Sequence, residues 1–253
     1  MIFYFSGTGN SKHVAECLTD KNLVNIGEAN KALEYEYEVG VNASVGVVCP
    51  VYYSGIPKPV LDFVDNMKLK GNVTYLYLVL THGGGPGGAG SMLETRLIKK
   101  GYKLDACFDV EMPSNYMIYY DLKKDDVLKA RIAKVPEQME SIIKSIDNKE
   151  HILPKWSKLD RVLTRSMKFL CEKDMPVKKF YADNECTGCG MCARNCPAGL
   201  IKMVDGKPQW TEDKCVRCMA CLSCPHVQYG SGTKKRRRYS YNRYAGKQDM
   251  TND

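Results

Sequence analysis

Eight cysteines crowd into one short stretch of this chain, and their placement limits what the chain can fold into. The sequence has 12 cysteines among 253 residues, and those that lie close together are Cys186, Cys189, Cys192, Cys196, Cys215, Cys218, Cys221 and Cys224. A secreted scaffold held by disulfides is a short chain with cysteines spread along it, whereas here a long cysteine-poor segment comes first. The distribution therefore favours a metal site in a reducing compartment.

The first four of these cysteines have an informative spacing. Residues 186–197 follow the pattern C-x2-C-x2-C-x3-C-P, which is the spacing of bacterial ferredoxins. Gly188 and Gly190 are small, so backbone amides near them are free to donate to cluster sulfurs. A zinc site would instead favour two separated C-x2-C pairs around a tetrahedral ion. The spacing predicts an iron–sulfur cluster, and a zinc ribbon is the alternative.

The second run, residues 215–225, is one residue shorter before its last cysteine. The two runs together resemble two-cluster ferredoxins, in which the fourth cysteine of each run binds the other cluster. The resemblance implies one 4Fe-4S cluster on Cys186, Cys189, Cys192 and Cys224 and another on Cys215, Cys218, Cys221 and Cys196. A loop that lacks one residue loses about 3.3–3.6 Å of reach. We therefore expect a strained bond at Cys224 and a labile cluster there.

Residues 1–111 alternate short apolar, β-rich runs with helical patterns. Strands are expected over 1–5, 23–26, 45–49, 73–81 and 107–111, and helices over 11–18, 57–67 and 91–100. Such alternation is typical of a parallel sheet covered by helices on both faces. More polar helical segments follow over 121–134, from 136 and over 155–171. Ligands of these sheets bind beyond the carboxyl ends of the strands, so the loops there form the candidate site.

The loop after the first expected strand is rich in glycine and small polar residues. It consists of Ser6, Gly7, Thr8, Gly9, Asn10 and Ser11. Hydroxyls, backbone N–H groups and the positive end of the following helix form a cradle for a phosphate group. The loop lacks the lysine of nucleotide triphosphate loops and the G-x-G-x-x-G of dinucleotide folds. It resembles the FMN phosphate loop of flavodoxins, and a capped strand-to-helix turn is the alternative.

Loops after three further strands extend this candidate site. They contribute Pro50, Tyr52 and Tyr53, then Thr81, His82, Gly83, Gly84 and Gly85, and finally Asn115 and Tyr116. The tyrosines would stack on an isoalloxazine ring, and the glycines permit close approach of the backbone to a flat ligand. A lone loop histidine is more often structural, and no residue is predicted to be catalytic.

Together, the four loops and the cysteine runs resemble a family of anaerobe proteins that fuse a flavodoxin-like domain to a two-cluster ferredoxin domain. The resemblance implies FMN, two 4Fe-4S clusters and electron transfer between them. We expect an α/β fold: a flavodoxin-like, doubly wound, parallel five-stranded sheet, a helical linker and a small α+β bacterial-ferredoxin domain. The expected divisions are 1–150 for the FMN-binding domain, 151–176 for the linker, 177–230 for the ferredoxin domain and 231–253 for a basic tail.

The net charge of +8 comes largely from one segment. Its cations are Lys234, Lys235, Arg236, Arg237, Arg238 and Arg243. We expect residues 234–238 to dock an acidic redox partner protein, with a solvated tail as the alternative and no role in nucleic-acid recognition. The apolar runs are far shorter than the roughly 18 residues that a membrane span requires, and no signal peptide precedes the first strand. The sequence therefore predicts a cytoplasmic protein.

These observations predict an electron-transfer flavoprotein that passes single electrons between two clusters and FMN and exchanges them with a redox partner. One alternative is a flavin-dependent reductase of a small substrate, a quinone or a disulfide, fed by the clusters. A second alternative is a zinc-containing protein that binds nucleic acid or has a structural role. The sequence leaves open whether this oxidoreductase has a substrate of its own.

Overall fold

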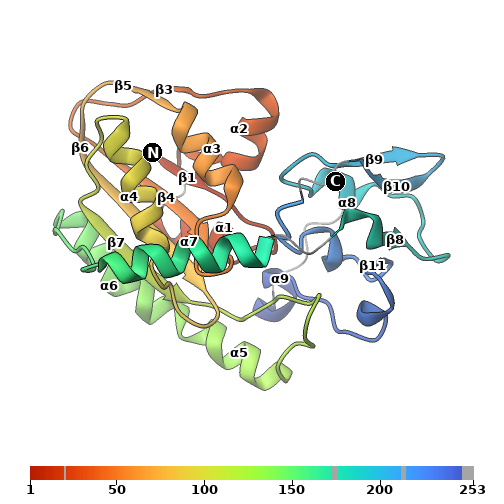
Figure 1. Cartoon of the computed structure of the whole chain (residues 1–253). Coiled ribbons are helices and arrows are strands. Elements are labelled where there is room, and N and C mark those ends of the chain that lie inside the picture. Colours follow the sequence, from red (N-terminus) through yellow and green to blue (C-terminus); the bar gives the residue numbers. More distant parts are fainter. Residues whose placement is uncertain (20, 173–175, 212–214, 247–253) are drawn as a thin grey trace.

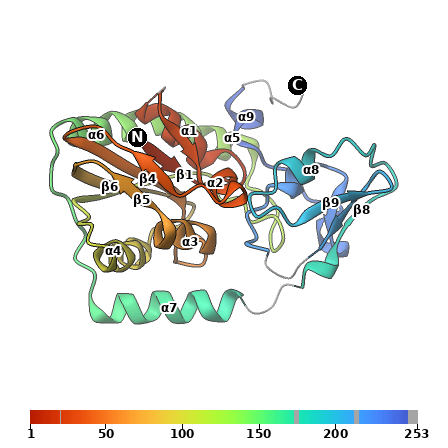
Figure 2. The same ribbon diagram turned by 90° about the horizontal axis from the view of Figure 1, so that it is seen from above.

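The computed structural model of the chain describes residues 1–19, 21–172, 176–211 and 215–246. An α/β body formed by the N-terminal part lies beside a smaller unit that carries the two cysteine runs (Figures 1 and 2). Residues 173–175 of the expected linker and the end of the expected tail, residues 247–253, lie outside the described residues.

A five-stranded parallel sheet forms the centre of the α/β body. Its strands are β1 Ile2–Tyr4, β2 Leu23–Asn25, β4 Ala43–Pro50, β6 Val73–His82 and β7 Ala106–Glu111. They lie in the order β2-β1-β4-β6-β7, and every pairing is parallel. All five were predicted, and the predicted fold class is confirmed. This order is the flavodoxin-like one, in which ligands bind where the strand order reverses, here between β1 and β4.

Helices cover both faces of the sheet (Figure 2). The side chains of β6 alternate between the two cores on either side of it. Tyr77 and Val79 pack into one core with helices α1 and α6, whereas Leu78 and Leu80 pack into the other core with α2, α3 and α4. This alternation follows the two-residue period of a strand. The helix bounds are α1 Asn10–Leu18, α2 Ile26–Ala32, α3 Lys58–Asn66, α4 Ala89–Lys99 and α6 Val135–Asp147.

Three short elements of the α/β body were not anticipated. Helix α2 follows β2 directly, and the side chain of Asn25 accepts a hydrogen bond from Gly27 N at 2.9 Å as its cap. Strands β3 Glu36–Glu38 and β5 Lys68–Lys70 pair as a separate parallel ribbon. Each strand has three residues, which is too short for a periodic hydrophobic pattern to appear.

Two further helices pack against helices of the α/β body. Helix α5 Asp125–Ala133 precedes α6, and helix α7 Lys158–Glu172 packs on the outside of α4. The contact of α7 is polar: Thr164 Oγ1 accepts from Gly88 N at 3.1 Å, and Lys168 Nζ donates to Ile56 O at 2.7 Å. No helix within the described ranges is both long enough and apolar enough to cross a membrane.

The C-terminal unit consists of short strands and single helical turns. Strand β8 Phe180–Ala182 pairs antiparallel with β11 Val227–Tyr229, and β9 Ile201–Val204 forms a hairpin with β10 Lys207–Trp210. One turn of α-helix, α8 Met191–Arg194, lies in the first cysteine run. A 3₁₀ turn, η2 Cys221–Ser223, lies in the second. The remaining 3₁₀ turns are η1 Val177–Lys179 and η3 Ser231–Thr233.

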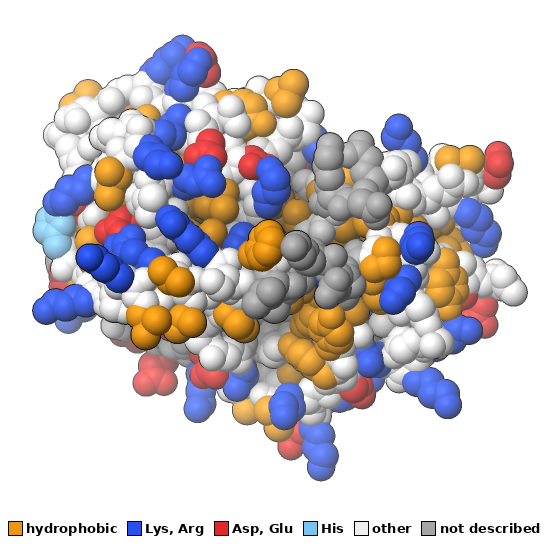
Figure 3. Space-filling view, in the orientation of Figure 1, with side chains coloured by type: hydrophobic (Ala, Val, Ile, Leu, Met, Phe, Trp, Pro, Cys, Tyr) orange, Lys and Arg blue, Asp and Glu red, His pale blue; other side chains and the backbone are white. Residues whose placement is uncertain are grey.

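The basic segment does not extend freely into solvent, contrary to the alternative of a solvated tail. Arg236 Nη1 donates to Met117 O at 2.7 Å, and Arg237 Nη1 lies 2.7 Å from Asp125 Oδ1. Arg238 is buried, while Lys234 and Lys235 remain exposed. Lysine and arginine side chains are also scattered over both parts of the face in Figure 3. Three of the five cations in 234–238 therefore join parts of the chain to one another.

Beyond the arginines, the chain returns to the loop that follows β1. Tyr239 is fully buried, and its hydroxyl donates to Asn10 Oδ1 at 2.6 Å. Tyr241 N donates to Thr8 O at 2.8 Å, and the Tyr241 ring stacks on His13 with centroids 4.2 Å apart. The short helix α9 Tyr241–Ala245 completes this segment. We call residues 236–245 the C-terminal strap.

We predict that Tyr239→Phe lowers the free energy of unfolding by about 1–3 kcal/mol, because the buried Asn10 Oδ1 loses its donor. Urea unfolding followed by circular dichroism measures the change. Tyr119→Phe is the matched control, because Tyr119 is 62% exposed and its replacement should change stability by less than about 0.5 kcal/mol. Equal effects of the two substitutions would contradict the prediction.

Candidate functional site

A pocket of about 360 Å³ opens where the strand order reverses, and the four predicted loops line it. Its volume lies in the range of about 300–1,000 Å³ that is usual for small-molecule sites. The predicted cofactor-binding residues along it are Ser6, Gly7, Thr8, Asn10, Ser11, Pro50, Tyr52, Tyr53, Thr81, His82, Gly83, Gly84, Gly85, Asn115 and Tyr116. Gly9 is absent from this lining and instead borders a groove on the other side of the loop. We call this cavity the loop pocket.

The loop after β1 is built around hydroxyl groups. Gly9 adopts a left-handed conformation with φ 97° directly before α1, and its N–H donates to Ser6 Oγ at 3.2 Å. Ser11 Oγ lies 2.8 Å from Thr81 Oγ1, and Asn115 Nδ2 donates to Thr8 Oγ1. The hydroxyls are thus held in place by neighbouring loops. Asn10 has a structural role, because it donates to Pro113 O at 3.3 Å and accepts from Tyr239.

The tyrosine loop is a tight turn. Tyr52 and Gly55 exchange two backbone hydrogen bonds of 2.9 and 3.0 Å, and Tyr53 and Ser54 between them have φ values of 52° and 59°. Two left-handed residues make a type I′ turn, which usually takes asparagine or glycine. The turn brings the Tyr53 hydroxyl against that of Tyr116, with the rings edge to face at 5.6 Å. Burial raises the pKa of both phenols, so both are neutral at physiological pH.

His82 organises the glycine-rich loop. Its Nδ1 accepts from Gly85 N at 2.8 Å, and its Nε2 lies 2.8 Å from Asp109 Oδ2. Arg131 of α5 supports the same loop by donating to Gly83 O at 3.0 Å. These contacts give His82 a structural role in the loop, which was the alternative to the predicted role in cofactor binding, and the predicted role stays a prediction.

A second, apolar cavity lies in the C-terminal unit. Four of the cysteines line it, namely Cys196, Cys215, Cys218 and Cys221, and Phe180, Leu200, Ile201 and Trp210 complete its walls. Leu200 N donates to Cys196 Sγ and Arg217 N to Cys215 Sγ, each at 3.4 Å. Amide donors to cysteine sulfur in an apolar cavity suit an iron–sulfur cluster. We call this space the inner cluster cavity.

The other four cysteines interact with one another on the solvent side. Burial raises the pKa of the Cys192 thiol to about 11, and the nearby Cys224 thiol adds to that rise. Burial also raises the pKa of Cys224, with Cys189 and Cys186 as neighbouring thiols. Cys189 is exposed. The structure thus brings the cysteines together in the two sets that the ferredoxin resemblance implies, although their role as ligands stays a prediction.

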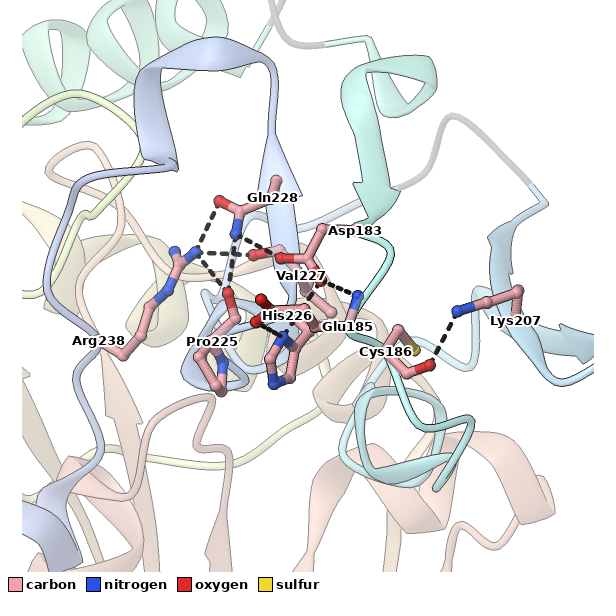
Figure 4. A network of polar contacts seen from close by, with 9 residues as sticks. All are labelled: Asp183, Glu185, Cys186, Lys207, Pro225, His226, Val227, Gln228 and Arg238. Atoms are coloured by element: carbon pink, nitrogen blue, oxygen red, sulfur yellow. Dashed lines mark hydrogen bonds and ion pairs between the residues drawn. The ribbon is translucent and has the colours of Figure 1, made fainter.

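A polar network joins the two chain segments of this outer set (Figure 4). Asp183 accepts from Glu185 N at 3.1 Å and lies 3.2 Å from His226 Nδ1. Arg238 Nη2 donates to Pro225 O at 3.2 Å and to Val227 O at 3.0 Å. Its Nη1 is buried and has no hydrogen-bond partner among the described residues. Because Arg238 interacts electrostatically with Cys224 of the outer set and with Cys221 of the inner set, this unpaired donor suits the anionic clusters that the two sets would hold.

The backbone before Cys224 compensates for the residue that the second cysteine run lacks. From Cys192 to Cys196 the chain runs through four steps of largely α-helical backbone, about 6 Å at 1.5 Å per residue. From Cys221 to Cys224 it runs through three steps of 3₁₀ backbone, also about 6 Å at 2.0 Å per residue. The tighter turn restores the reach that the missing residue removes. The expected lability of the outer cluster stays a prediction.

The loop pocket and the inner cluster cavity share one wall. Arg217, Cys218 and Met219 line both spaces. At Gly7, a Cβ atom would lie 2.1 Å from Cys218 O, so glycine is required for this contact. Sequence reasoning missed Arg217 and Met219. A position-by-position comparison of the two cysteine runs could have found them, because the equivalent residues of the first run are Gly188 and Gly190.

We predict that Gly7→Ala separates the loop from the second cysteine run and destabilises the protein by about 1–3 kcal/mol, as overpacking does. Thermal unfolding of the anaerobically purified protein measures this effect. Gly40→Ala is the control, since a Cβ there meets nothing within 4 Å. A Gly7→Ala variant as stable as the control would contradict the contact.

Comparison with known proteins assigns the C-terminal unit. Residues 178–242 match the family model of the 4Fe-4S dicluster domain. A search of curated proteins gives no significant match. Among solved structures, a flavoprotein of Bacteroides uniformis described as putative aligns at 13% identity over 44% of this chain and 88% of its own, with a TM-score of 0.32.

Two other solved structures align with the chain. The Trp repressor binding protein of Bacillus subtilis does so at 10% identity, over 62% of this chain and all of its own, with a TM-score of 0.35. The flavodoxin of Megasphaera elsdenii does so at 18% identity, over 43% and 85%, with a TM-score of 0.32. The strand order and the family match together show that the chain joins a flavodoxin-like α/β domain to a 4Fe-4S dicluster domain of the ferredoxin type.

Proposed function

We propose that this protein is an electron-transfer flavoprotein that binds FMN in the loop pocket and two 4Fe-4S clusters on its eight clustered cysteines. The shared wall of residues 217–219 carries the proposal, because the same three residues line both spaces. When bound, 4Fe-4S clusters exchange one electron at a time and a flavin one or two. Because the flavin site and the two cluster sites lie on one folded chain, the fold sets their order and the distances between them.

The positions of the two cysteine sets suggest where electrons enter or leave the protein. Cys189 of the outer set is exposed, whereas Cys218 of the inner set lies against the loop pocket. Cys221 interacts electrostatically with Cys192, so the two sets adjoin each other. Electrons would therefore enter or leave at the outer set and reach the loop pocket through the inner set.

A redox partner protein would then dock beside the outer set. Arg194 Nη1 donates to Cys189 O and Lys207 Nζ to Cys186 O, each at 2.8 Å, so two cations flank the exposed cysteine loop. We propose an acidic one-electron carrier as the partner. We place the docking site here and not at residues 234–238, where it was first expected, because Arg194 and Lys207 are exposed beside Cys189, whereas Arg238 is buried and Arg236 and Arg237 are partly buried.

The loop pocket suits FMN because its phosphate cradle consists of hydroxyls and amides. We predict that Thr8→Ala weakens FMN binding about tenfold or more, since a hydrogen bond to a charged group contributes about 1.5–3 kcal/mol. Quenching of flavin fluorescence on titration of the apoprotein measures the affinity. Thr95→Ala is the control, because its hydroxyl bonds within α4. Unchanged binding by Thr8→Ala would exclude this loop from the site.

The proposed order of sites predicts different effects for two cysteine substitutions. Cys189→Ser should reduce the iron content from about eight to about four per chain and slow flavin reduction by a one-electron protein donor, while FMN affinity stays the same. Cys17→Ser, outside both sets, should change neither quantity. Iron analysis and stopped-flow absorbance test this. Flavin reduction at the wild-type rate in Cys189→Ser would show that electrons enter at the flavin, as a substrate reductase would allow.

A further inference from the structure

Two residues of the second cysteine run have an unusual backbone. Arg217 and Met219 adopt the left-handed conformation, with φ values of 56° and 64°. The equivalent residues of the first run, Gly188 and Gly190, have φ values of 76° and 75°. The two runs thus fold alike, but the second bears side chains where the fold favours glycine. For a residue with a Cβ, this conformation is strained.

The surroundings of the two runs explain where a side chain fits. At Gly188 a Cβ would lie 2.6 Å from Gly206 O, so the β9–β10 hairpin excludes one. At the equivalent position in the second run, the neighbouring space is the loop pocket, and Arg217 lines it. Arg217 is nevertheless only 7% exposed, and its guanidinium carbon lies 5.9 Å from the centre of the Tyr53 ring. Strain at a buried charged residue beside a pocket indicates a functional role.

The charge of Arg217 stands out among the residues that line the loop pocket. Among the residues that the structure describes, that lining contains no other lysine or arginine and no aspartate or glutamate. Burial strengthens the interaction of a charge with a ligand, because the effective dielectric constant is lower than in water. Arginine stays protonated throughout the physiological range, so the charge is fixed.

We propose that Arg217 tunes the flavin, favouring the reduced form of FMN in the loop pocket over the oxidised form. The inference rests on the proposed binding of FMN there. Two-electron reduction of FMN with uptake of one proton from water leaves one additional negative charge on the ring system. The fixed positive charge of Arg217 stabilises that charge and has a weaker effect on the neutral oxidised ring. The strained conformation holds this charge on the wall next to the inner cluster cavity.

The test compares the affinity of the whole protein for oxidised FMN with its affinity for FMN reduced by dithionite. Arg217→Gln removes the charge, and Arg217→Lys keeps it. We expect the ratio of reduced to oxidised affinity to fall about tenfold or more in Arg217→Gln and to stay near the wild-type value in Arg217→Lys. A tenfold fall corresponds to about 30 mV in the two-electron potential.

Two further variants separate this role from a structural one. Arg217→Gly introduces the residue that the first run already has at the equivalent position, so it should fold and show the same fall as Arg217→Gln. Arg161→Gln is the matched control: Arg161 lies 5.9 Å from the Trp156 ring, the same type of contact outside the pocket, and its loss should leave the ratio unchanged.

The outcomes distinguish the inference from the function on which it rests. If the wild-type protein binds FMN but Arg217→Gln and Arg217→Gly keep its affinity ratio, the tuning role is wrong and the proposed function stands. If the ratio of reduced to oxidised affinity falls as far in Arg217→Lys as in Arg217→Gln, the position of the side-chain group and not its charge determines the effect, and the proposal is also wrong. If the wild-type protein binds no FMN, both proposals fail.

Discussion

The close approach of Cys218 to Gly7 is the contact on which the arrangement of this protein depends. A Cβ at position 7 would lie 2.1 Å from Cys218 O, so the chain achieves this approach by having no side chain there. A similar contact occurs nearby, where a Cβ on Gly27 would lie 2.9 Å from Pro197 Cβ. Both glycines belong to the α/β domain; Gly7 faces the predicted cluster ligand Cys218, and Gly27 faces Pro197, which follows the predicted ligand Cys196. The loop after β1, residues 6–11, therefore forms one side of the interface between the two domains and also lines the loop pocket.

The C-terminal strap holds this interface from the other side. Tyr239 and Tyr241 bond to Asn10 and Thr8 of the same loop, while Arg238 bonds to the backbone that follows Cys224. One segment thus connects the loop pocket with the outer cysteine set. A run of arginines that looks in the sequence like a solvated extension has internal partners, because buried carbonyl oxygens are good acceptors for a guanidinium group. Its net charge alone gave no indication of that role.

The sequence was sufficient to predict the sheet and the pocket loops, because each rests on local pattern, whereas the grouping of the cysteines into two sets came from the resemblance to two-cluster ferredoxins. The five strands have hydrophobic runs, the loops lie at strand ends, and the first cysteine run has a ferredoxin spacing. The unpredicted features depend on contacts between distant segments. The bond from Tyr239 to Asn10 joins residues 229 positions apart, and no periodicity records such a pair. The 3₁₀ turn before Cys224 was missed for a different reason, since spacing gives the number of residues but not the rise per residue.

The two cysteine runs share one loop conformation but contact different parts of the molecule. In the first run glycines occupy the left-handed positions, and the loop meets the β9–β10 hairpin and solvent. In the second run the same positions carry Arg217 and Met219, and the loop meets the α/β domain. Left-handed arginine and methionine are unfavourable by themselves, so packing against the neighbouring domain must stabilise them. The side chains that distinguish the runs therefore lie where the second cysteine run meets the α/β domain.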